Sequence, residues 1–297
     1  MINNVKISIL IATRNRSSSL ARLIDALSAQ VDSPPFEVIV GDNGSSDDTP
    51  RVVENARAQL KIHYVYEGCP GKGRALNAAF KLAQGNLIVF TDDDVLPHRN
   101  WLAQLYATSL KYPEVNIFGG LIEVNFKDVP HWIQRSYNLM GLLTSAHKCG
   151  DTDVIYPYGQ YPFGPNMAVR RHLLMGTDAP YPEHLGPGTK YPVGDESAFF
   201  LQFSSPGAGD RIFTPSAKVF HRIEPHNMTF NKVLHRCYVS GRGSVHIPYS
   251  GSALFSDSRS STWNLIFSRM KSSKSLRELI CISARYCGYI ISKIKKS

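Results

Sequence analysis

The 297-residue chain is predicted to adopt an α/β fold, with a mostly parallel central sheet flanked by helices. Short apolar runs alternate with helical patterns through its first half, which is typical of strands joined by crossover helices. Two of these runs, Ile7–Ile11 and Leu87–Phe90, are continuously apolar, which favours strands buried on both faces. Polar residues follow three of the runs, and such sheets bind ligands beyond the carboxyl ends of their strands.

The elements of the first half follow one another with short connections. A strand is expected over Val5–Thr13, and a helix over Ser18–Gln30, where leucines recur at helical spacing. Pro50 suits the first turn of the next helix, and Gly85 is a plausible C-cap. The remaining elements expected here are strands at 36–44, 61–68 and 86–94 and helices at 47–60, 73–85 and 98–112.

The periodicity weakens after residue 112. A strand is expected at 117–126, and residues 128–194, rich in Tyr, Pro and Gly, are expected to be irregular apart from a helical signal at 167–176. Residues 191–203 indicate a loop leading into a helix, and 211–223 a strand. We therefore expect one domain over 1–245, divided into halves at 1–120 and 121–245. A Ser-rich hinge and a helical tail are expected over 246–297.

The formal charge of +9 is concentrated in the tail. Residues 271–297 hold seven Lys or Arg and one acid, Glu278, so the body is not a general polyanion binder. Nucleic-acid binding is not expected, because the basic residues are not interleaved with stacking aromatics. The tail pattern is that of a basic amphipathic helix, which either lies at an anionic membrane surface or packs on the domain.

Cysteine usage and hydropathy indicate the compartment. Five cysteines without a CxxC pair favour reduced thiols in a cytoplasmic protein. The apolar run Ile7–Ala12 is too short for a secretory signal and is interpreted as a buried strand. No uncharged apolar stretch reaches the ~18 residues that a spanning helix needs. We expect a location on the inner face of the cell membrane, held peripherally by the tail.

Three successive aspartates, Asp92, Asp93 and Asp94, follow a buried run. One of them would be enough to cap a helix starting near Pro97. Mg²⁺ or Mn²⁺ is the other way to stabilise converging carboxylates, since both ions prefer oxygen ligands. On an extended segment, Asp92 and Asp94 would point the same way. Asp93 could then turn toward a sugar hydroxyl.

Two further segments suit a nucleotide. Asp42 ends a buried strand, where its carboxylate could accept a hydrogen bond from a nucleobase. Lys72 and Arg74 stand beside glycines at the start of a helix, an arrangement that suits phosphate binding. A solvated connection and a solvated helix start are the alternative interpretations. No Walker lysine pattern is present.

Taken together, these motifs resemble family 2 glycosyltransferases, which have the GT-A fold and use nucleotide-sugar donors. The resemblance covers about residues 5–245. Its motifs are Thr13-Arg14-Asn15, Asp42-Asn43-Gly44-Ser45 with Asp48, Gly73 to Asn77, Thr91-Asp92-Asp93-Asp94 with Pro97, Phe163–Arg171, Gly194–Phe200 and Ala217–Ile223.

The resemblance implies a role for each motif. Asp94, with Asp92, would hold Mn²⁺ or Mg²⁺ on the diphosphate, and His221 would be a further ligand. Asp42 would bind the base, and Asp92 or Asp93 would contact the ribose or the sugar. The residues expected to bind the nucleotide sugar are Thr13, Arg14, Asn15, Asp42, Lys72, Arg74, Asn77, Asp92 and Asp93.

The segment that resembles the catalytic-base motif is "GDESAFF", in which Asp195 precedes Glu196. The family usually places the two acids in the opposite order. Alignment of the second acid makes Glu196 the base and residue type makes Asp195 the base; Glu196 is favoured. Capping of the following helix is the alternative for both, although one acid would be enough for that.

The expected reaction is inverting transfer of a sugar from a nucleotide diphosphate, expected to be UDP, to a hydroxyl of a glycan or lipid-linked acceptor of a surface polysaccharide. No second carboxylate is placed as a nucleophile, which favours inversion. Trp132, Tyr161 and Asn166 are the candidate acceptor residues, because sugar rings pack on aromatic faces; a loop core is the alternative. The rival functions are a nucleotidyltransferase and an inactive nucleotide- or sugar-binding protein.

Overall fold

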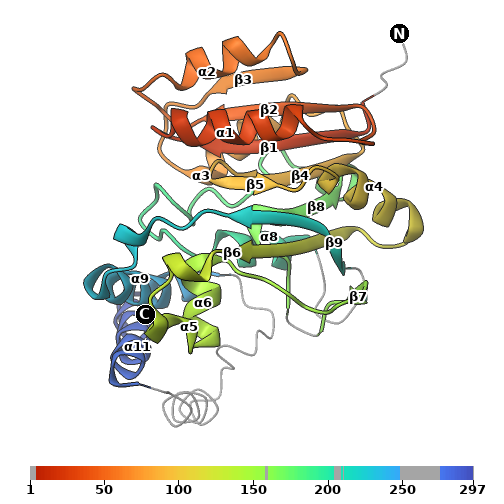
Figure 1. The fold of residues 1–297 in the computed structure, drawn as a ribbon. Coiled ribbons are helices and arrows are strands. Elements are labelled where there is room, and N and C mark those ends of the chain that lie inside the picture. The colour runs from red at the N-terminus through yellow and green to blue at the C-terminus, as the bar shows by residue number, and fades with distance from the viewer. Residues whose placement is uncertain (1–4, 158–159, 204–208, 210, 248–274, 297) are drawn as a thin grey trace.

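The computed structural model describes residues 5–157, 160–203, 209, 211–247 and 275–296 (Figure 1). The strands are β1 (Ile7–Thr13), β2 (Phe36–Asp42), β3 (Ile62–Tyr66), β4 (Leu87–Asp92), β5 (Val95–Pro97), β6 (Ile117–Val124), β7 (Val154–Ile155), β8 (Met167–Arg170) and β9 (Arg211–His221). The helices are α1 (Ser17–Ser28), α2 (Thr49–Ala56), α3 (Lys72–Phe80), α4 (Trp101–Lys111), α5 (His131–Gln134), α6 (Tyr137–Thr144), α7 (Arg171–Leu174), α8 (Asp195–Phe203), α9 (Phe230–Ser244) and α11 (Leu276–Lys296).

The described strands form one nine-stranded sheet in the order β3-β2-β1-β4-β8-β6-β9-β5, with β7 paired to β9. Strands β3, β2, β1 and β4 are parallel, which confirms the expected sheet of the first half. The strand order reverses at β1: the chain adds β2 and β3 on one side of β1 and then places β4 on its other side. Such a switch point leaves a crevice beyond the carboxyl ends of the strands.

Helices cover both faces of this sheet, as the continuously apolar strands require. Ile7, Ile9 and Ile11 of β1 pack in one buried cluster with residues of α1, α2 and α4. Leu10 points to the opposite cluster, which α3 and α8 share. Burial of each such side chain contributes roughly 1.5–3 kcal/mol. The strand ends that carry the polar motifs are therefore held by a rigid support.

The expectation of a helical segment at 167–176 is wrong for its first half. Met167–Arg170 form β8, which pairs antiparallel with both β4 and β6, and only Arg171–Leu174 are helical. Met167, Ala168 and Val169 are fully buried. Pairing with a strand on each side stabilises the extended conformation of this segment, although its local pattern alone would allow a helix.

The segment after the three aspartates also differs from expectation. Val95–Pro97 form β5, which pairs antiparallel with β9, and α4 begins only at Trp101 with Asn100 as its N-cap residue. Asp94 therefore lies too far from α4 to cap it. The helix-cap interpretation of the aspartates is excluded, and their carboxylates need another explanation.

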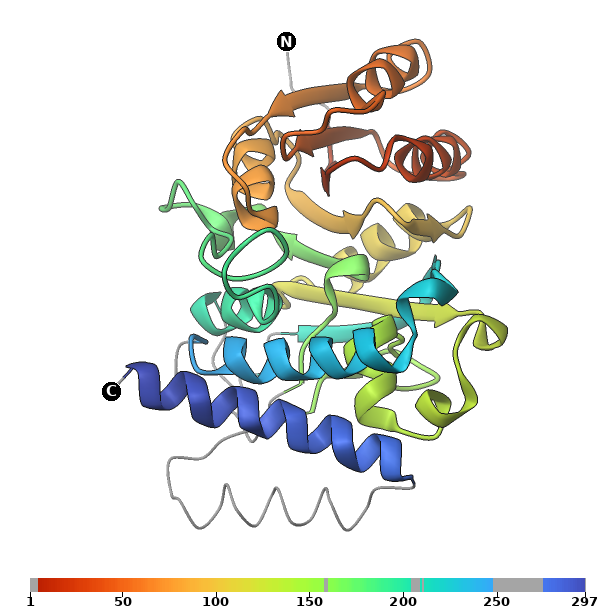
Figure 2. The ribbon, with the colours of Figure 1, turned by 90° about the vertical axis from the view of Figure 1, so that its left-hand side faces the viewer.

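Helices α5, α6, α9 and α11 gather beyond the β6 and β9 side of the sheet (Figures 1 and 2). A third buried cluster joins them, to which Ile133, Leu139 and Val233 belong. Residues 128–194 are therefore less irregular than the sequence indicates. The expected Ser-rich hinge falls mainly on 248–274, outside the described residues. No described helix is long and apolar enough to cross a membrane.

The tail helix α11 lies along α9 at close range (Figure 2). A Cβ atom on Gly241 of α9 would stand 1.7 Å from the Arg285 carbonyl oxygen, and one on Gly288 of α11 would stand 2.1 Å from that of Tyr238. Only glycines permit two helix backbones to approach this closely. Of the two interpretations of the tail, the helix packed on the domain is what the structure contains, and several apolar side chains of α11 still face outward.

Substitution of Gly241 by Ala is expected to lower the free energy of unfolding by about 1–3 kcal/mol, because a methyl group would force α11 away from α9. Thermal unfolding followed by circular dichroism measures this. The matched control is Gly141→Ala in α6, where the nearest atom is a ring carbon of Phe163 at 4.0 Å. A helical Gly→Ala change with room around it should be neutral or stabilising. Equal midpoints for the two variants would contradict the tight packing of α11.

Candidate active site

A cavity of about 2000 Å³ opens beyond the carboxyl ends of β1 and β4 and extends to α9 and α11. Its lining includes Thr13 at the end of β1, Lys72 at the start of α3 and the three aspartates after β4. Asp195 and Glu196, at the start of α8, line the same cavity. The convergence of loops that the sequence predicts is therefore present, and it brings the two acidic motifs into one space.

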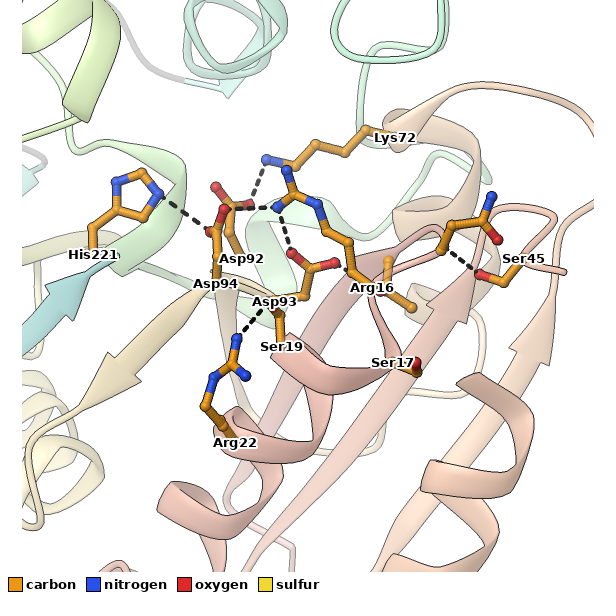
Figure 3. Close-up of polar contacts among 12 residues, drawn as sticks. Arg16, Ser17, Ser19, Arg22, Ser45, Lys72, Asp92, Asp93, Asp94 and His221 are labelled. Atoms are coloured by element: carbon orange, nitrogen blue, oxygen red, sulfur yellow. Dashed lines mark hydrogen bonds and ion pairs between the residues drawn. The ribbon is translucent and has the colours of Figure 1, made fainter. Parts of the chain in front are cut away.

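Each of the three aspartates faces a cationic or hydrogen-bonding side chain (Figure 3). Lys72 Nζ lies 2.6 Å from Asp92 Oδ1. Arg16 Nη1 donates to Asp93 Oδ1 at 2.9 Å and to Asp94 Oδ2 at 2.7 Å. Thr13 Oγ1 donates to Asp93 Oδ2 at 2.7 Å. The like charges are thus held together by cations from two other loops.

These partners give the neighbouring carboxylates different acidities. Burial raises the pKa of Asp93 to about 6, against the opposing effect of Arg16. Burial would also raise the pKa of Asp94, but His221 and Arg16 bring it down to about 2. Burial would lower the pKa of His221, and the Asp94 carboxylate raises it above its usual value. Asp94 is therefore the carboxylate most firmly held in its anionic form.

The donor set around Asp94 fits a hard divalent cation. Asp94 Oδ1 is buried, and its charge partner is His221, whose Nε2 lies 3.2 Å away without hydrogen-bond geometry. His221 Nδ1 lies 2.6 Å from the Thr144 carbonyl oxygen, to which only a protonated Nδ1 can donate. In the neutral ring Nε2 is then free to bind a metal, an arrangement common in metal sites.

The site is not assembled as a ready metal cage. Among the described residues, no group of three or more His, Cys, Asp or Glu side chains is arranged to hold a metal ion. The reason is visible in the contacts: Lys72 takes one oxygen of Asp92, and Arg16 takes one oxygen of Asp94. Both cations would have to shift before Asp92, Asp94 and His221 could act together, so the metal site stays a prediction.

Glu196 and Asp195 differ in surroundings although they are adjacent. Burial, followed by the charge of Asp195, raises the pKa of Glu196 to about 7, against the opposing charge of Lys72. Asp195 is buried and accepts a hydrogen bond from the Tyr181 hydroxyl at 3.3 Å. A Cβ atom on Gly164 would stand 2.2 Å from Glu196 Oε1, so the glycine leaves the room that this carboxylate occupies. Glu196 is thus an acid that changes charge near neutral pH.

Lys72 links the two acidic groups electrostatically. Burial would lower the pKa of Lys72, but Asp92, Asp195 and Glu196 raise it well above its usual value. The amine therefore stays charged throughout the neutral range. Its charge therefore acts on Asp92 and on the Asp195–Glu196 pair alike.

Two residues of the expected nucleotide pocket, Asp42 and Asn15, are already held by protein groups. Asp42 is fully buried, and its carboxylate accepts from the Ser45 amide at 2.8 Å and the Tyr64 hydroxyl at 2.7 Å. Asn15, at φ 52°, accepts from the Ser46 amide at 2.7 Å. Arg14 is exposed and lines the cavity. The loops after β1 and β2 are therefore tied to each other, and the base-binding role of Asp42 stays a prediction.

Arg74 and Asn77 lie on α3 but do not line the cavity. Arg74 pairs with Glu183 at 3.1 Å. Asn77 is buried, where its side chain bonds the backbone of Tyr181 and the Glu183 carboxylate. In this structure both residues hold the 181–183 segment against α3, so any contact with a nucleotide would need that segment to move.

The three candidate acceptor residues are not brought together at the cavity lining. Asn166 is fully buried, and its side chain bonds Trp101 and the carbonyls of Leu121 and Ala217. Tyr161 stacks on Phe200 at 5.3 Å between ring centroids. Trp132 meets Phe230 edge-on at 5.9 Å. These contacts agree with the alternative interpretation, a core for the loops, at all three positions.

Arg16 is the residue of this site that the sequence reasoning missed. It lies two positions after Arg14, on the loop that the motif Thr13-Arg14-Asn15 already marks. The available signal was a second arginine on a loop expected to face three carboxylates. The choice between Arg14 and Arg16 depends on which way the loop turns, and that is not encoded in the residue types.

Removal of the Arg16 charge by Arg16→Met is expected to lower the free energy of unfolding in metal-free buffer by about 1–2 kcal/mol. The Asp93 side chain is only 5% exposed and would lose its cation, although half-exposure of Arg16 reduces the effect. Thermal unfolding with EDTA measures this, and added Mn²⁺ should stabilise the variant more than the wild type. The control is Arg51→Met, whose pair with Asp48 is exposed. Equal Mn²⁺ stabilisation of variant and wild type would contradict competition between Arg16 and a cation.

Comparison with known proteins identifies the family of these motifs. The family model described as Glycosyl transferase family 2 matches residues 8–174, more than half of the chain. The poly(ribitol-phosphate) beta-N-acetylglucosaminyltransferase TarS of Staphylococcus aureus is 27% identical over 187 residues, which cover 61% of this chain and 30% of that protein. Three curated relatives are matched over only 34%, 23% and 30% of their own length.

Solved structures agree with the fold. The mannosyltransferase PcManGT from Pyrobaculum calidifontis, in complex with GDP-Man and Mn²⁺, is similar at a TM-score of 0.63 and 16% identity, over 100% of this chain and 89% of that one. Residues 1–349 of TarS, in complex with UDP-GlcNAc, are similar at 0.54 and 16% identity, over 98% and 92%. The expected GT-A fold with a C-terminal helix is thereby confirmed.

Proposed function

Because the chain belongs to glycosyl transferase family 2, we propose that it is an inverting, metal-dependent glycosyltransferase. The observation that carries the proposal is the shared cavity. It places the cation-bound aspartates after β4 and an acid with a pKa of about 7, Glu196, in one space at a sheet switch point. A cluster of that kind suits the diphosphate of a donor, and Glu196 suits proton removal from an acceptor.

In the proposed reaction, Asp94, Asp92 and His221 would hold Mn²⁺ or Mg²⁺, and the bound ion would supply positive charge to the leaving nucleotide diphosphate. Lys72, once its amine has moved off Asp92, adds a positive charge beside the diphosphate. Glu196 takes the proton of the acceptor hydroxyl as that oxygen attacks the anomeric carbon. One base opposite the leaving group gives inversion in a single displacement.

The proposed donor is a UDP-sugar, with Asp42 and Thr13 at the base and Asp93 at the ribose or the sugar. Support for UDP comes from the TarS complex with UDP-GlcNAc, while the PcManGT complex holds GDP-Man. The cavity of about 2000 Å³ has room for a donor and an acceptor together, since pockets for drug-sized ligands measure about 300–1,000 Å³.

Calorimetric titration with UDP, GDP, dTDP and CDP, each with Mn²⁺ or with EDTA, tests the proposal. One nucleotide should bind at least tenfold more tightly than the others, and only with Mn²⁺. If none of the four binds, or if EDTA makes no difference, the proposed transferase site is wrong. Product analysis with the matching nucleotide sugar then separates an enzyme from an inactive binding protein.

We also propose that the protein works at the inner face of a membrane, on a glycan or lipid-linked acceptor of a surface polysaccharide. Support comes from a row of exposed apolar side chains near the two ends of α11, which the helical repeat places on one side of the helix. The row consists of Leu276, Ile280, Ile290, Ile291 and Ile294. Residues 271–297 carry seven Lys or Arg against one acid, and such a charge favours anionic lipid.

Partition of the full chain onto vesicles is expected to need anionic lipid and the apolar row. Ile280→Ser, Ile291→Ser and Ile294→Ser combined should weaken binding to phosphatidylglycerol-containing vesicles at least tenfold, because each loses buried apolar area. Vesicles of phosphatidylcholine alone should bind weakly. The matched control, Leu110→Ser on α4, removes a leucine that is 63% exposed and should not change binding. An unchanged triple variant would exclude α11 as the anchor.

A further inference from the structure

The cavity continues past the proposed catalytic groups to a wall formed by α9 and α11. Two helical stripes line it, and we refer to them together as the basic wall. From α9 they are Lys232, Arg236, Ser240 and Ser244, and from α11 they are Arg285, Tyr289 and Lys293. Both stripes repeat every four residues, so on each helix the side chains lie on one face about 6 Å apart along the axis. Every member carries a hydrogen-bond donor.

The charges of the cavity are divided between its two ends. Ten Lys or Arg and seven acids line it. Five of the acids are the aspartates after β4 together with Asp195 and Glu196. Six of the ten cations lie on α9, on α11 or in the segment 135–148: Arg135, Lys148, Lys232, Arg236, Arg285 and Lys293. Lys148 pairs with Asp151, and two further acids, Glu123 and Glu224, line the cavity. Most of the acids are therefore at the reacting end, and α9 and α11 contribute only cations to the lining.

The cations of α9 are not neutralised by the protein. Lys232 Nζ donates to the Asn227 side-chain oxygen at 3.1 Å, and Arg236 Nε donates to the Leu142 carbonyl at 3.3 Å. Both partners are uncharged. No carboxylate of a described residue lies within ion-pair distance of Lys232 or Arg236. Both residues are exposed at the cavity, so their charges are solvated and available to attract an anionic ligand.

We propose that the basic wall binds a phosphate-bearing acceptor, and that it holds the acceptor by its phosphates while the hydroxyl reaches Glu196. This inference rests on the proposed transferase function and names the acceptor class for it. Arginine forks and lysine ammonium groups are the side chains that bind phosphate best. An uncharged sugar would gain nothing from the unpaired cations of Lys232 and Arg236, which would stay solvated or become unfavourably buried.

The charge division also explains how such an acceptor is oriented. A phosphate would be repelled by the carboxylates around Asp93 and Asp195 and attracted by the opposite wall. An acceptor with phosphate and hydroxyl groups is therefore drawn in with its phosphate toward α9 and α11. Its neutral hydroxyl end then faces the catalytic acids. Attraction across a cavity with low-dielectric walls is stronger than at an open surface.

The test is calorimetric titration of the full chain with a linear oligomer of glycerol phosphate. A neutral maltooligosaccharide and an oligogalacturonate of equal length are the comparison ligands. The double variant Lys232→Gln/Arg236→Gln is compared with Arg51→Gln/Lys81→Gln, which removes two exposed cations elsewhere. A UDP titration with Mn²⁺ on the same samples reports the donor end separately, and circular dichroism verifies the fold.

We expect the glycerol phosphate oligomer to bind the wild type in a salt-dependent manner and the double variant at least tenfold more weakly. The control variant should bind like the wild type. Equal binding by the double variant overturns the proposal, and so does binding of oligogalacturonate as tight as that of the phosphate oligomer. If UDP binding fails in every sample while the oligomer result holds, the transferase function falls and the anion site remains.

The phosphate could come from a soluble polymer or from a lipid diphosphate. Farnesyl diphosphate represents the lipid source. Its binding is assigned to the basic wall only if the double variant binds it more weakly than the wild type. If it binds the wall and the glycerol phosphate oligomer does not, the acceptor phosphate is that of a lipid carrier. If the oligomer binds and farnesyl diphosphate does not, the phosphate belongs to the polymer. Failure of both to bind overturns the assignment.

Discussion

Replacement of Asp94 by Asn is expected to abolish Mn²⁺-dependent nucleotide binding and to lower turnover by about 10³-fold or more. Asp94 Oδ1 is buried and faces its ion-pair partner, His221 Nε2, at 3.2 Å. An amide oxygen carries no formal charge, so it is a much weaker ligand for a hard cation. A loss of 10³-fold corresponds to about 4 kcal/mol of transition-state stabilisation. Calorimetry with the preferred nucleotide, followed by initial rates, measures both effects.

The control for Asp94→Asn is Asp48→Asn, the same chemical change at a side chain that is 64% exposed. It should leave binding and turnover unchanged. Asp94→Asn also removes the anion that holds Arg16 and His221, so its unfolding midpoint must be measured to separate lost ligation from lost folding. A folded Asp94→Asn protein that still needs Mn²⁺ for binding would remove Asp94 from the proposed ligand set.

The first half of the fold was predictable because its signals are local and agree with one another. Runs such as Ile7–Ile11 can be buried on both faces only between layers of helices, and the connections leave a parallel sheet as the arrangement. β8 was not predictable in that way. Its residues pair with β4 and β6: Ala168 lies opposite Val89 and opposite Phe118, which are 79 and 50 residues earlier in the chain. A local pattern contains no information about such partners.

The site shows the same limit at the level of single side chains. The motif positions of Asp92, Asp94, Glu196 and His221 put them in or beside one cavity because strand ends converge at a sheet edge. Asn166 belongs to an equally clear motif, yet its side chain holds the core by bonding Trp101. Whether a polar residue points to a ligand or to the core depends on the rotation of its strand end, which composition and spacing do not determine.

Glu196→Gln is expected to lower turnover by about 10²–10⁴-fold while nucleotide binding stays within about twofold, because the amide cannot take a proton from the acceptor. For the wild type, turnover should fall as pH drops through about 7. The raised pKa of Glu196 means that the carboxyl is protonated, and inactive as a base, below that pH. Well below the pKa, the rate should decrease tenfold for each pH unit. Initial rates from pH 5 to 9, with an acceptor in excess, measure this limb.

Asp195→Asn is the matched comparison, since the two acids are adjacent and line the same cavity. Removal of the Asp195 charge takes away the second-largest cause of the raised pKa of Glu196, so the acid limb should move to lower pH and persist. If Asp195 were the base, Asp195→Asn would lose turnover as Glu196→Gln is expected to, and Glu196→Gln would retain a pH-dependent rate. The two pH profiles therefore assign the base, even if both substitutions reduce the maximum rate. The variant that lacks the base loses the pH-dependent fall in rate, whereas the variant that lacks only a positioning residue keeps it at a shifted pH.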